Sequence, residues 1–206
     1  MKMKAILFDL DNTLVNTHEI LNNYLIKISQ KYYKITPKEE HQLETTTIEG
    51  VEEWMKLHGI KINPLTKITM LLHFIFTDIK HIQLKKDAKK ILGNMQKKLA
   101  LGIITNGPSI YAKKIMRINK IKNYFQTIQT ATTNKAKPNP EMIYKAAKKL
   151  AVKPSECIVV DDGKQGIIAG KKAGCKTIYL SSNKNIKSDF YAKNLSEVEK
   201  IIKKLI

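Results

Sequence analysis

The sequence predicts an α/β fold, in which a Rossmann-like parallel sheet carries helices on both faces and is interrupted by an inserted all-helical cap domain. Three observations lead to this prediction. Ala5–Phe8 is a short apolar run of the kind that forms a strand buried on both faces. From Lys85 onward, similar runs alternate with amphipathic helical segments, which is typical of a parallel sheet. Between these two parts, the apolar residues have helical spacing.

The stretch with helical spacing sets the expected domain boundaries. We expect residues 16–83 to form this helical domain, called the cap below, and residues 1–15 and 84–206 to form the α/β core. The cap should contain four helices, and the fourth is apolar enough to be the centre of a helical bundle. The four segments are His18–Tyr33, a polar helix from Pro37 through Glu44, Val51–His58 and about Leu65–Ile79.

Within the core, helices and strands should alternate up to a helix at the C-terminus. Asn139 before Pro140 is a helix-start signal, and Gly174 is a helix-stop signal. Ser196 and Glu199 fit a capping box for the last helix. The other expected helices are Asp87–Lys98, Ser109–Asn119, Pro140 to about Leu150 and one that ends near Lys172, and the expected strands are Leu101–Thr105, Phe125–Thr130, Cys157–Val160 and Lys176–Leu180.

Length and composition are those of an ordinary globular protein. The 206 residues can bury a full core, and 43% of them are hydrophobic and 27% charged. No apolar run reaches membrane-spanning length, and the N-terminus leads into the first strand without a cleavage site, so we expect no membrane partner and a cytoplasmic protein. Cys157 and Cys175 lie in or beside apolar segments, which favours burial over a disulfide.

The net charge of +19 is unusual for a globular protein of this size. It comes almost wholly from lysine, because Arg117 is the only arginine, and the lysines are spread over nearly every predicted helix. Surfaces that bind phosphate favour arginine, because its guanidinium group can form bidentate hydrogen bonds. We therefore expect a compositional bias and no specific nucleic-acid partner, with a polynucleotide phosphatase or nucleic-acid binder as the alternative.

The histidines exclude one class of mechanism. All five lie within the predicted cap or at its edges, and none forms an i, i+4 metal-binding pair with another. A Ser-His-Asp or Cys-His mechanism confined to the core is therefore excluded. The five are His18, His41, His58, His73 and His81.

Polar side chains gather at the predicted strand ends. Because the carboxyl ends of parallel strands share one edge of the sheet, these side chains should lie together. Each group alone could be an ordinary turn or helix cap. Acids, a hydroxyl and a lysine at one edge suit a Mg²⁺ ion and a phosphate group together. The residues are Asp9, Asp11, Thr105, Asn106, Asp161 and Asp162, with Lys137 before a helix start.

On these residues the chain resembles the haloacid dehalogenase superfamily, whose four motifs occur here in order along the whole chain. The first is D-x-D-x-T, the second a hydrophobic strand ending in Thr or Ser, the third a lysine before proline, and the fourth an acidic pair after a strand. The matches are Asp9, Asp11 and Thr13, then Thr105 in IITNGP, Lys137 in KPNP, and Asp161 with Asp162 in IVVDDGKQG.

The sequence departs from the family pattern at one position. Many members carry a further acid after the fourth motif, where this chain has Gly166. In members with an adjacent acidic pair the second acid serves instead, so Asp162 should replace it. Lys135 is a second possible lysine, but Lys137 directly precedes proline and is preferred.

The resemblance implies a Mg²⁺-dependent phosphatase that acts on a small phosphorylated metabolite, such as a sugar phosphate or nucleotide, through an aspartyl-phosphate. Asp9 would be the nucleophile and Asp11 the general acid and base. Mg²⁺ would be bound by Asp9, Asp161 and the main-chain carbonyl of Asp11. Asp162 would lie next to these ligands without binding the ion directly. Thr105, Asn106 and Lys137 would bind the phosphoryl group.

Two rival functions share these residue types. A dehalogenase of the same superfamily does without the metal and generally lacks an acid at the position of Asp11. A phospho-accepting signalling module also uses Asp, Thr, Lys and Mg²⁺, but an acid such as Asp11 would hasten loss of its phosphate. The cap should select the substrate, with His18 and Trp54 as candidate contacts, although core packing is the alternative for Trp54.

Overall fold

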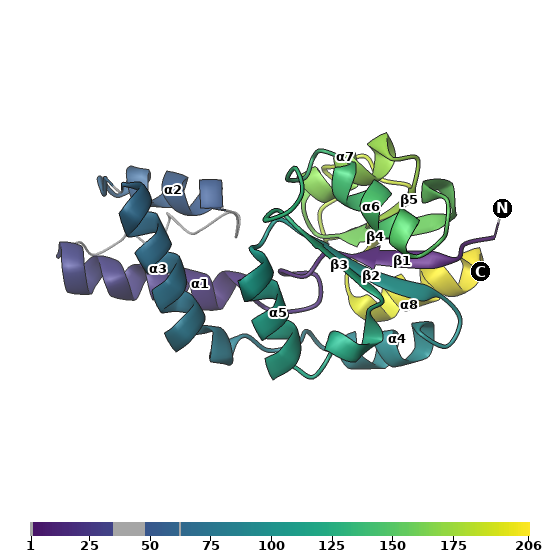
Figure 1. Ribbon diagram of the computed structural model, residues 1–206, viewed down its shortest axis with the longest axis horizontal. Helices are drawn as coiled ribbons and strands as arrows, with labels where there is room; N and C mark the ends of the chain where they lie inside the picture. Colours follow the sequence, from purple (N-terminus) through teal and green to yellow (C-terminus); the bar gives the residue numbers. More distant parts are fainter. Residues whose placement is uncertain (1, 35–47, 62) are drawn as a thin grey trace. The chain divides into compact units, whose positions relative to one another are not determined.

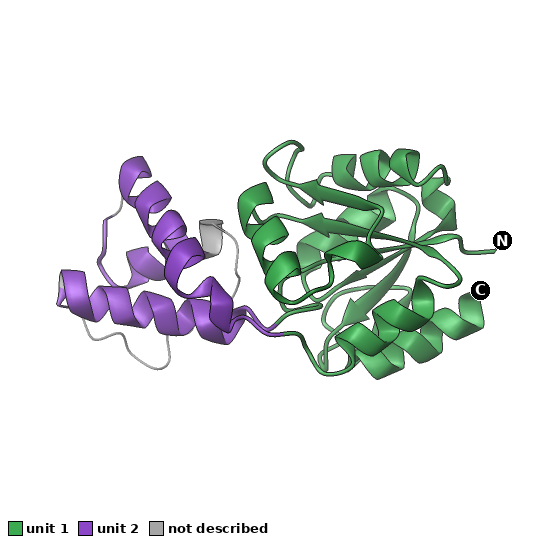
Figure 2. Ribbon diagram, turned by 60° about the horizontal axis from the view of Figure 1, so that its bottom comes forward, with its two compact units in different colours: residues 1–15, 84–206 green, residues 16–83 purple. Residues whose placement is uncertain are grey.

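The computed structural model describes residues 2–34, 48–61 and 63–206. The helix predicted from Pro37 through Glu44, and His41 within it, lie outside these residues. The chain divides into two compact units, one of residues 1–15 and 84–206 and the other of residues 16–83 (Figure 2).

The first unit is built on a six-stranded sheet in which every neighbouring pair of strands is parallel. The strand order is β3-β2-β1-β4-β5-β6, so the first strand of the chain is central. This confirms the predicted Rossmann-like α/β fold. The strands are β1 Ala5–Phe8, β2 Ala100–Thr105, β3 Thr127–Thr130, β4 Cys157–Asp161, β5 Lys176–Leu180 and β6 Phe190–Ala192.

Helices cover both faces of this sheet (Figure 1). On one face α6 and α7 pack against the central strands, and on the other α8 lies beside α4. A cluster of buried apolar residues from β1, β2, β4, α6 and α7 fills the first of these interfaces. The helices are α4 Ala88–Met95, α5 Ser109–Ile118, α6 Glu141–Lys149, α7 Lys164–Lys172 and α8 Leu195–Leu205, with short 3₁₀ turns at Lys122–Tyr124 and Pro154–Glu156.

The central position of β1 places the acids that follow it between two other strand ends. Phe8 pairs with Ile103 of β2 on one side and with Val160 of β4 on the other. The N–H of Asp9 continues this ladder and donates to the carbonyl of Val160 at 2.9 Å. Asp9 is therefore held by main-chain bonding at the carboxyl edge of the sheet, where ligands bind in open parallel sheets.

The predicted capping box of the last helix is wrong. The residue that caps α8 is Asn194, whose side chain accepts from the N–H of Glu197 at 2.9 Å. Ser196 lies inside the helix and donates to Asp87 Oδ2 at 2.9 Å, while Glu199 accepts from Asn94. Asn is as good an N-cap as Ser, so the chain offers two plausible starts two residues apart.

The second unit is helical in its described residues. Helix α1, His18–Ile28, continues as a π-helical turn at Ser29–Tyr33, and the other elements are α2 Ile48–Leu57, α3 Pro64–Thr77 and a 3₁₀ turn at Ile79–His81. The prediction that the fourth helix is a bundle centre is wrong for part of α3. Leu72 and Phe76 are 40% and 69% exposed, and only Phe74 and Ile75 of this helix are buried.

Trp54 is buried inside the second unit, with its ring 4.1 Å from that of His58. This supports the core-packing alternative for Trp54. Cys157 and Cys175 are buried free thiols, as the sequence predicted. Among the described residues, no helix combines the length and apolar character needed to cross a membrane.

Candidate active site

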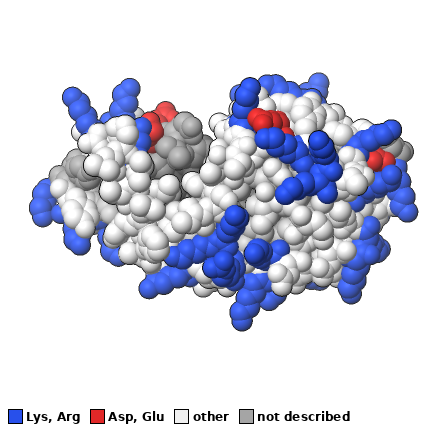
Figure 3. Space-filling view, in the orientation of Figure 1, with Lys and Arg blue, Asp and Glu red and all other residues white. Residues whose placement is uncertain are grey.

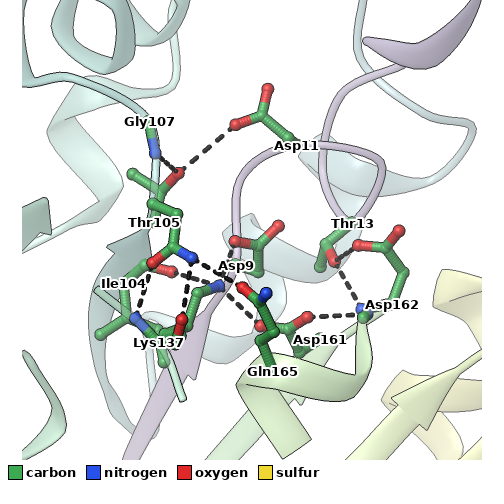
Figure 4. Close-up of polar contacts among 12 residues, drawn as sticks. Asp9, Asp11, Thr13, Ile104, Thr105, Gly107, Lys137, Asp161, Asp162 and Gln165 are labelled. Carbon is green, nitrogen blue, oxygen red and sulfur yellow. Dashed lines mark hydrogen bonds and ion pairs between the residues drawn. The ribbon is translucent and has the colours of Figure 1, made fainter. Parts of the chain in front are cut away.

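The predicted polar residues of the core meet at the carboxyl edge of the sheet (Figure 4). Asp9 and Asp11 follow β1, Thr105 ends β2, and Asp161 ends β4 with Asp162 directly after it. Lys137 reaches the same place from the segment between β3 and α6. The sheet topology thus collects residues from four separate stretches of the chain.

Lys137 is the cation at the centre of this group. Its Nζ lies 2.6 Å from Asp9 Oδ1 and 2.8 Å from Asp161 Oδ2, and it also donates to the carbonyl of Ile104 at 3.2 Å. The side chains of Lys137, Asp9 and Asp161 are all buried. Lys135, the other possible lysine, is exposed. The structure therefore brings Lys137, and not Lys135, to the acids.

Burial and charge act in opposite directions on this lysine. Burial favours the neutral amine, but the adjacent carboxylates of Asp161 and Asp9 outweigh it, so the pKa of Lys137 is raised. Lys137 is therefore a permanent cation at neutral pH. Burial raises the pKa of Asp9 well above its ordinary value, and Asp161, Asp162 and Asp11 raise it further, against the opposing effect of Lys137. One lysine does not compensate all these acids.

Three of the acids are arranged as a cation site. Asp9, Asp161 and Asp162 each offer a carboxylate oxygen, and these oxygens all lie within 4.8 Å of one another. Burial, followed by the charge of Asp161, raises the pKa of Asp162 to about 7, despite the hydroxyl of Thr13 and the charge of Lys85. A set of oxygen donors with excess negative charge fits a hard divalent cation such as Mg²⁺ or Ca²⁺.

Main-chain and hydroxyl donors fix two of these acids. Thr13 Oγ1 donates to Asp162 Oδ1 at 2.8 Å and accepts from the N–H of Asp162 at 3.1 Å. The N–H of Gly163 donates to Asp161 Oδ1 at 2.8 Å. The threonine of the first motif therefore ties the loop after β1 to the loop after β4.

Gly166 lacks a side chain because Asp161 occupies the space. A Cβ added at Gly166 would lie 1.7 Å from Oδ2 and 2.1 Å from Cγ of Asp161, far inside contact distance. The further acid that many superfamily members carry here would displace Asp161 from its place beside Lys137. The departure from the family pattern is thus coupled to the position of Asp161.

The Asp11 carboxylate lies apart from this acidic group. In Figure 4 it points toward Thr105 and away from Asp161 and Asp162. Its Oδ2 accepts from Thr105 Oγ1 at 3.3 Å, and its Oδ1 accepts a hydrogen bond from the hydroxyl of Tyr111. Two neighbouring acids, Asp9 and Asp11, therefore have different partners, a cation for one and hydroxyl groups for the other.

Asn106 fixes the main chain of the lysine. Its Oδ1 accepts from the N–H of Lys137 at 2.8 Å, and its Nδ2 donates to the carbonyl of Lys137 at 3.2 Å and to Gln165 Oε1 at 3.0 Å. These contacts link β2 to the segment that carries Lys137. Direct contact of Asn106 with a substrate remains a prediction.

Sequence reasoning missed two residues of this site. Tyr111 lies on α5, and no spacing rule says that its hydroxyl turns back to the acid after β1. Lys85 follows the helical unit, and its pKa is lowered by burial against the raising effect of Asp162 and Asp9. One lysine among 36 gives no sequence signal, because 37 residues of the chain are Lys or Arg and one of these is arginine.

Known proteins resemble this chain in sequence and in fold. The profile of the family described as haloacid dehalogenase-like hydrolase matches residues 6–180. The chain is 31% identical to a Clostridium perfringens protein whose provisional name is pyrophosphatase PpaX, over 98% of this chain and 99% of that protein. It is 27% identical to the pyrophosphatase PpaX of Bacillus mycoides, over 88% of this chain and 85% of that protein.

Among solved structures, a predicted phosphoglycolate phosphatase from Haemophilus somnus superposes with a TM-score of 0.82 at 21% identity, and the match covers 98% of both chains. At this identity the likeness concerns the fold. The family match covers most of the sequence, including all four motifs. It confirms the family that the motifs predicted, and this chain belongs to the haloacid dehalogenase-like hydrolase family.

Proposed function

We propose that this protein is a Mg²⁺-dependent phosphatase, which hydrolyses a small phosphorylated metabolite through a phosphorylated form of Asp9. The observation that carries the proposal is the buried group of Lys137, Asp9 and Asp161, with Asp162 beside it. A phosphate monoester is an anion, so a site for it must supply positive charge next to its nucleophile. Lys137 supplies one such charge, and the excess of acids leaves room for a divalent cation.

Asp9 is the proposed nucleophile. One of its carboxylate oxygens forms a bond to phosphorus while the bond from phosphorus to the leaving oxygen breaks. Water then attacks phosphorus, the bond to Asp9 breaks, and inorganic phosphate leaves. Splitting the displacement into two steps is the usual advantage of covalent catalysis. Burial of Asp9 against Lys137 fixes the direction of its carboxylate, which favours in-line attack.

Asp11 is the proposed general acid and base. It would give its proton to the leaving oxygen in the first step and take one from the attacking water in the second. Its partners support this role, because hydroxyl groups can bond to either protonation state, whereas an ion pair would hold the ionised form. The nucleophile must be ionised to attack phosphorus, and the charge of Lys137 favours the ionised form of Asp9 against the effect of burial on its pKa.

Asp9, Asp161 and the main-chain carbonyl of Asp11 are the proposed Mg²⁺ ligands, with Asp162 beside them. When bound, the ion supplies positive charge that offsets the repulsion between a carboxylate and a phosphate group. Lys137 and the hydroxyl of Thr105 would contact phosphoryl oxygens. Asn106 would place Lys137 through the two main-chain hydrogen bonds described above, and it is a further proposed contact of the phosphoryl group.

The proposed substrate is small. The relatives named above are called a pyrophosphatase and a phosphoglycolate phosphatase, and both names imply a leaving group of a few atoms. Residues 16–83 would act as a cap that selects this leaving group, because this segment begins directly after the first motif and ends just before Lys85. A closing cap limits the volume of a site and keeps out water.

A panel of phosphate compounds tests the proposal. Purified protein is assayed for phosphate release from pyrophosphate, phosphoglycolate, sugar phosphates, nucleotides and p-nitrophenyl phosphate, with Mg²⁺ and with EDTA. We expect Mg²⁺-stimulated release from at least one compound, and none from Asp9→Asn. Stable phosphorylation of the protein without turnover would favour the phospho-accepting module instead. Absence of both would refute the proposal.

A further inference from the structure

Both carboxylate oxygens of Asp11 receive a hydroxyl donor. Thr105 Oγ1 donates to Oδ2 at 3.3 Å, and the phenol of Tyr111 donates to Oδ1. Thr105 belongs to the second motif, but Tyr111 belongs to none of the four. One of the two hydroxyl donors to Asp11 thus comes from a residue to which neither the motifs nor the family match gives a role.

The Tyr111 ring is held in place by its surroundings. Tyr111 is the third residue of α5 and is buried. A Cβ added at Gly107 would lie 3.0 and 3.2 Å from two ring carbons of Tyr111, so the ring packs directly on the main chain at Gly107. The N–H of Gly107 in turn donates to Thr105 Oγ1 at 3.0 Å. The loop after β2 therefore positions both hydroxyl groups that bind Asp11.

A fixed donor of this kind controls where a carboxyl group points. An aspartate side chain has several rotamers, and only some of them reach a given oxygen of a bound ester. A hydrogen bond from a buried phenol to a carboxylate is stronger than one between neutral groups, so it favours one rotamer over the others. It also stabilises the carboxylate that remains after a proton has been given away.

We propose that Tyr111 is a positioning residue that holds the Asp11 carboxyl group in the orientation needed for its two proton transfers. The inference rests on the proposed phosphatase function. In the first transfer the proton passes from Asp11 to the leaving oxygen, and in the second it passes from water to Asp11. Tyr111 donates its hydrogen bond to an oxygen of the Asp11 carboxyl group in both of its protonation states, and Tyr111 itself neither gains nor loses a proton.

The dependence of the rate on the leaving group separates this role from a structural one. A p-nitrophenolate leaves without protonation, whereas the alkoxide of an alkyl phosphate needs a proton from the acid. We therefore compare Tyr111→Phe with the unchanged protein, using kcat/KM for p-nitrophenyl phosphate and for the best alkyl phosphate of the panel. The matched control is Tyr144→Phe, because Tyr144 lies on α6 and its hydroxyl donates to the carbonyl of Lys172, on α7, at 3.3 Å.

We expect Tyr111→Phe to lower kcat/KM for the alkyl phosphate by roughly 10- to 100-fold and for p-nitrophenyl phosphate by less than about 3-fold. Tyr144→Phe should change kcat/KM for neither ester, and Asp11→Asn should lower kcat/KM with the same selectivity but to a greater extent.

Equal losses of kcat/KM on both esters, or no loss, would overturn the role of Tyr111. Thermal unfolding of Tyr111→Phe shows whether a uniform loss reflects misfolding, which would also count against the inference. If the unchanged protein releases phosphate from no compound of the panel, the proposed function itself fails.

Discussion

Lys137 and Asp9 form a buried ion pair, with Nζ 2.6 Å from Oδ1, although they lie 128 positions apart in the chain. The same ammonium group pairs with Asp161 at 2.8 Å. The pairing links the end of β1, the end of β4 and the segment before α6. It therefore has two consequences, one for stability and one for chemistry.

Replacing Lys137 by Met should lower stability and abolish most activity. The change leaves Asp9 and Asp161 buried without their cation, which costs roughly 3 kcal/mol in the free energy of unfolding. Because a divalent cation at the same acids would compensate part of the charge, Mg²⁺ should restore more stability to this variant than to the unchanged protein. Urea unfolding with and without Mg²⁺ measures both effects.

Lys135→Met is the matched control, because Lys135 is two residues away and exposed. It should unfold at the same urea concentration as the unchanged protein and keep its activity. If Lys137→Met were as stable and as active as this control, the ion pair would have neither consequence.

Asp9 and Asp11 should respond differently to the same substitution. Asp9→Asn should abolish turnover and incorporation of phosphate into the protein, because an amide is a poor nucleophile. Asp11→Asn should slow turnover on the order of 10²-fold or more through loss of acid and base catalysis. Steady-state rates and acid-quenched labelling distinguish the two. Near-normal turnover in Asp9→Asn would show that another group attacks phosphorus.

The sheet, and the sheet edge at which the site lies, could be predicted because both follow from simple sequence patterns. Buried strands such as Ala5–Phe8 are short apolar runs, and the acids that follow them stand out against the runs. The topology of parallel sheets then brings the strand ends together. Strand β6, Phe190–Ala192, escaped prediction because three residues at a sheet edge, two of them half-buried and one buried, are too few to give a periodic signal.

The remaining site residues depend on three-dimensional packing. Tyr111 reaches Asp11 because the loop at Gly107 lets its ring lie against the main chain, and no short-range pattern records that contact. Gly166 stands where many family members have an acid. In the structure its lack of a Cβ makes room for the side chain of Asp161. In both cases a glycine matters for the space that it leaves, which sequence spacing cannot show.

Gly166→Ala should weaken metal binding. The added methyl group would overlap Asp161, so that carboxylate must leave its place beside Lys137 or the helix must shift. We expect the Mg²⁺ concentration for half-maximal activity to rise roughly 10- to 100-fold. Gly93→Ala in α4 is the control, because a Cβ there meets nothing within 4 Å. An unchanged Mg²⁺ dependence in Gly166→Ala would contradict the coupling proposed between the space at Gly166 and metal binding by Asp161.

The charge of +19 should give only weak, non-specific binding to nucleic acids. Lysines are spread over the face shown in Figure 3, over both units, instead of gathering in one patch. Each phosphate neutralised by a lysine releases counterions, so such binding falls steeply with salt. We expect no measurable binding to labelled oligonucleotides near physiological salt by fluorescence anisotropy. Tight binding of a defined oligonucleotide under these conditions would instead support the polynucleotide alternative.

Substitutions in residues 16–83 should change which ester is preferred and leave the chemical step intact. His18 is the first candidate, because it opens α1 only a few residues after the first motif and is partly exposed. Trp54 is buried among the helices, so its replacement should lower stability before it affects selection. We expect His18→Ala to alter the ratio of kcat/KM values between physiological esters, and to change hydrolysis of p-nitrophenyl phosphate by less than about 3-fold, since the phosphoryl group is bound by the core.

The exposed residue Lys56 of α2 offers a control, because Lys56→Ala should affect neither value. If substitutions throughout residues 16–83 left the ranking of esters unchanged while substitutions in the core altered it, the surface that selects the substrate would belong to the core.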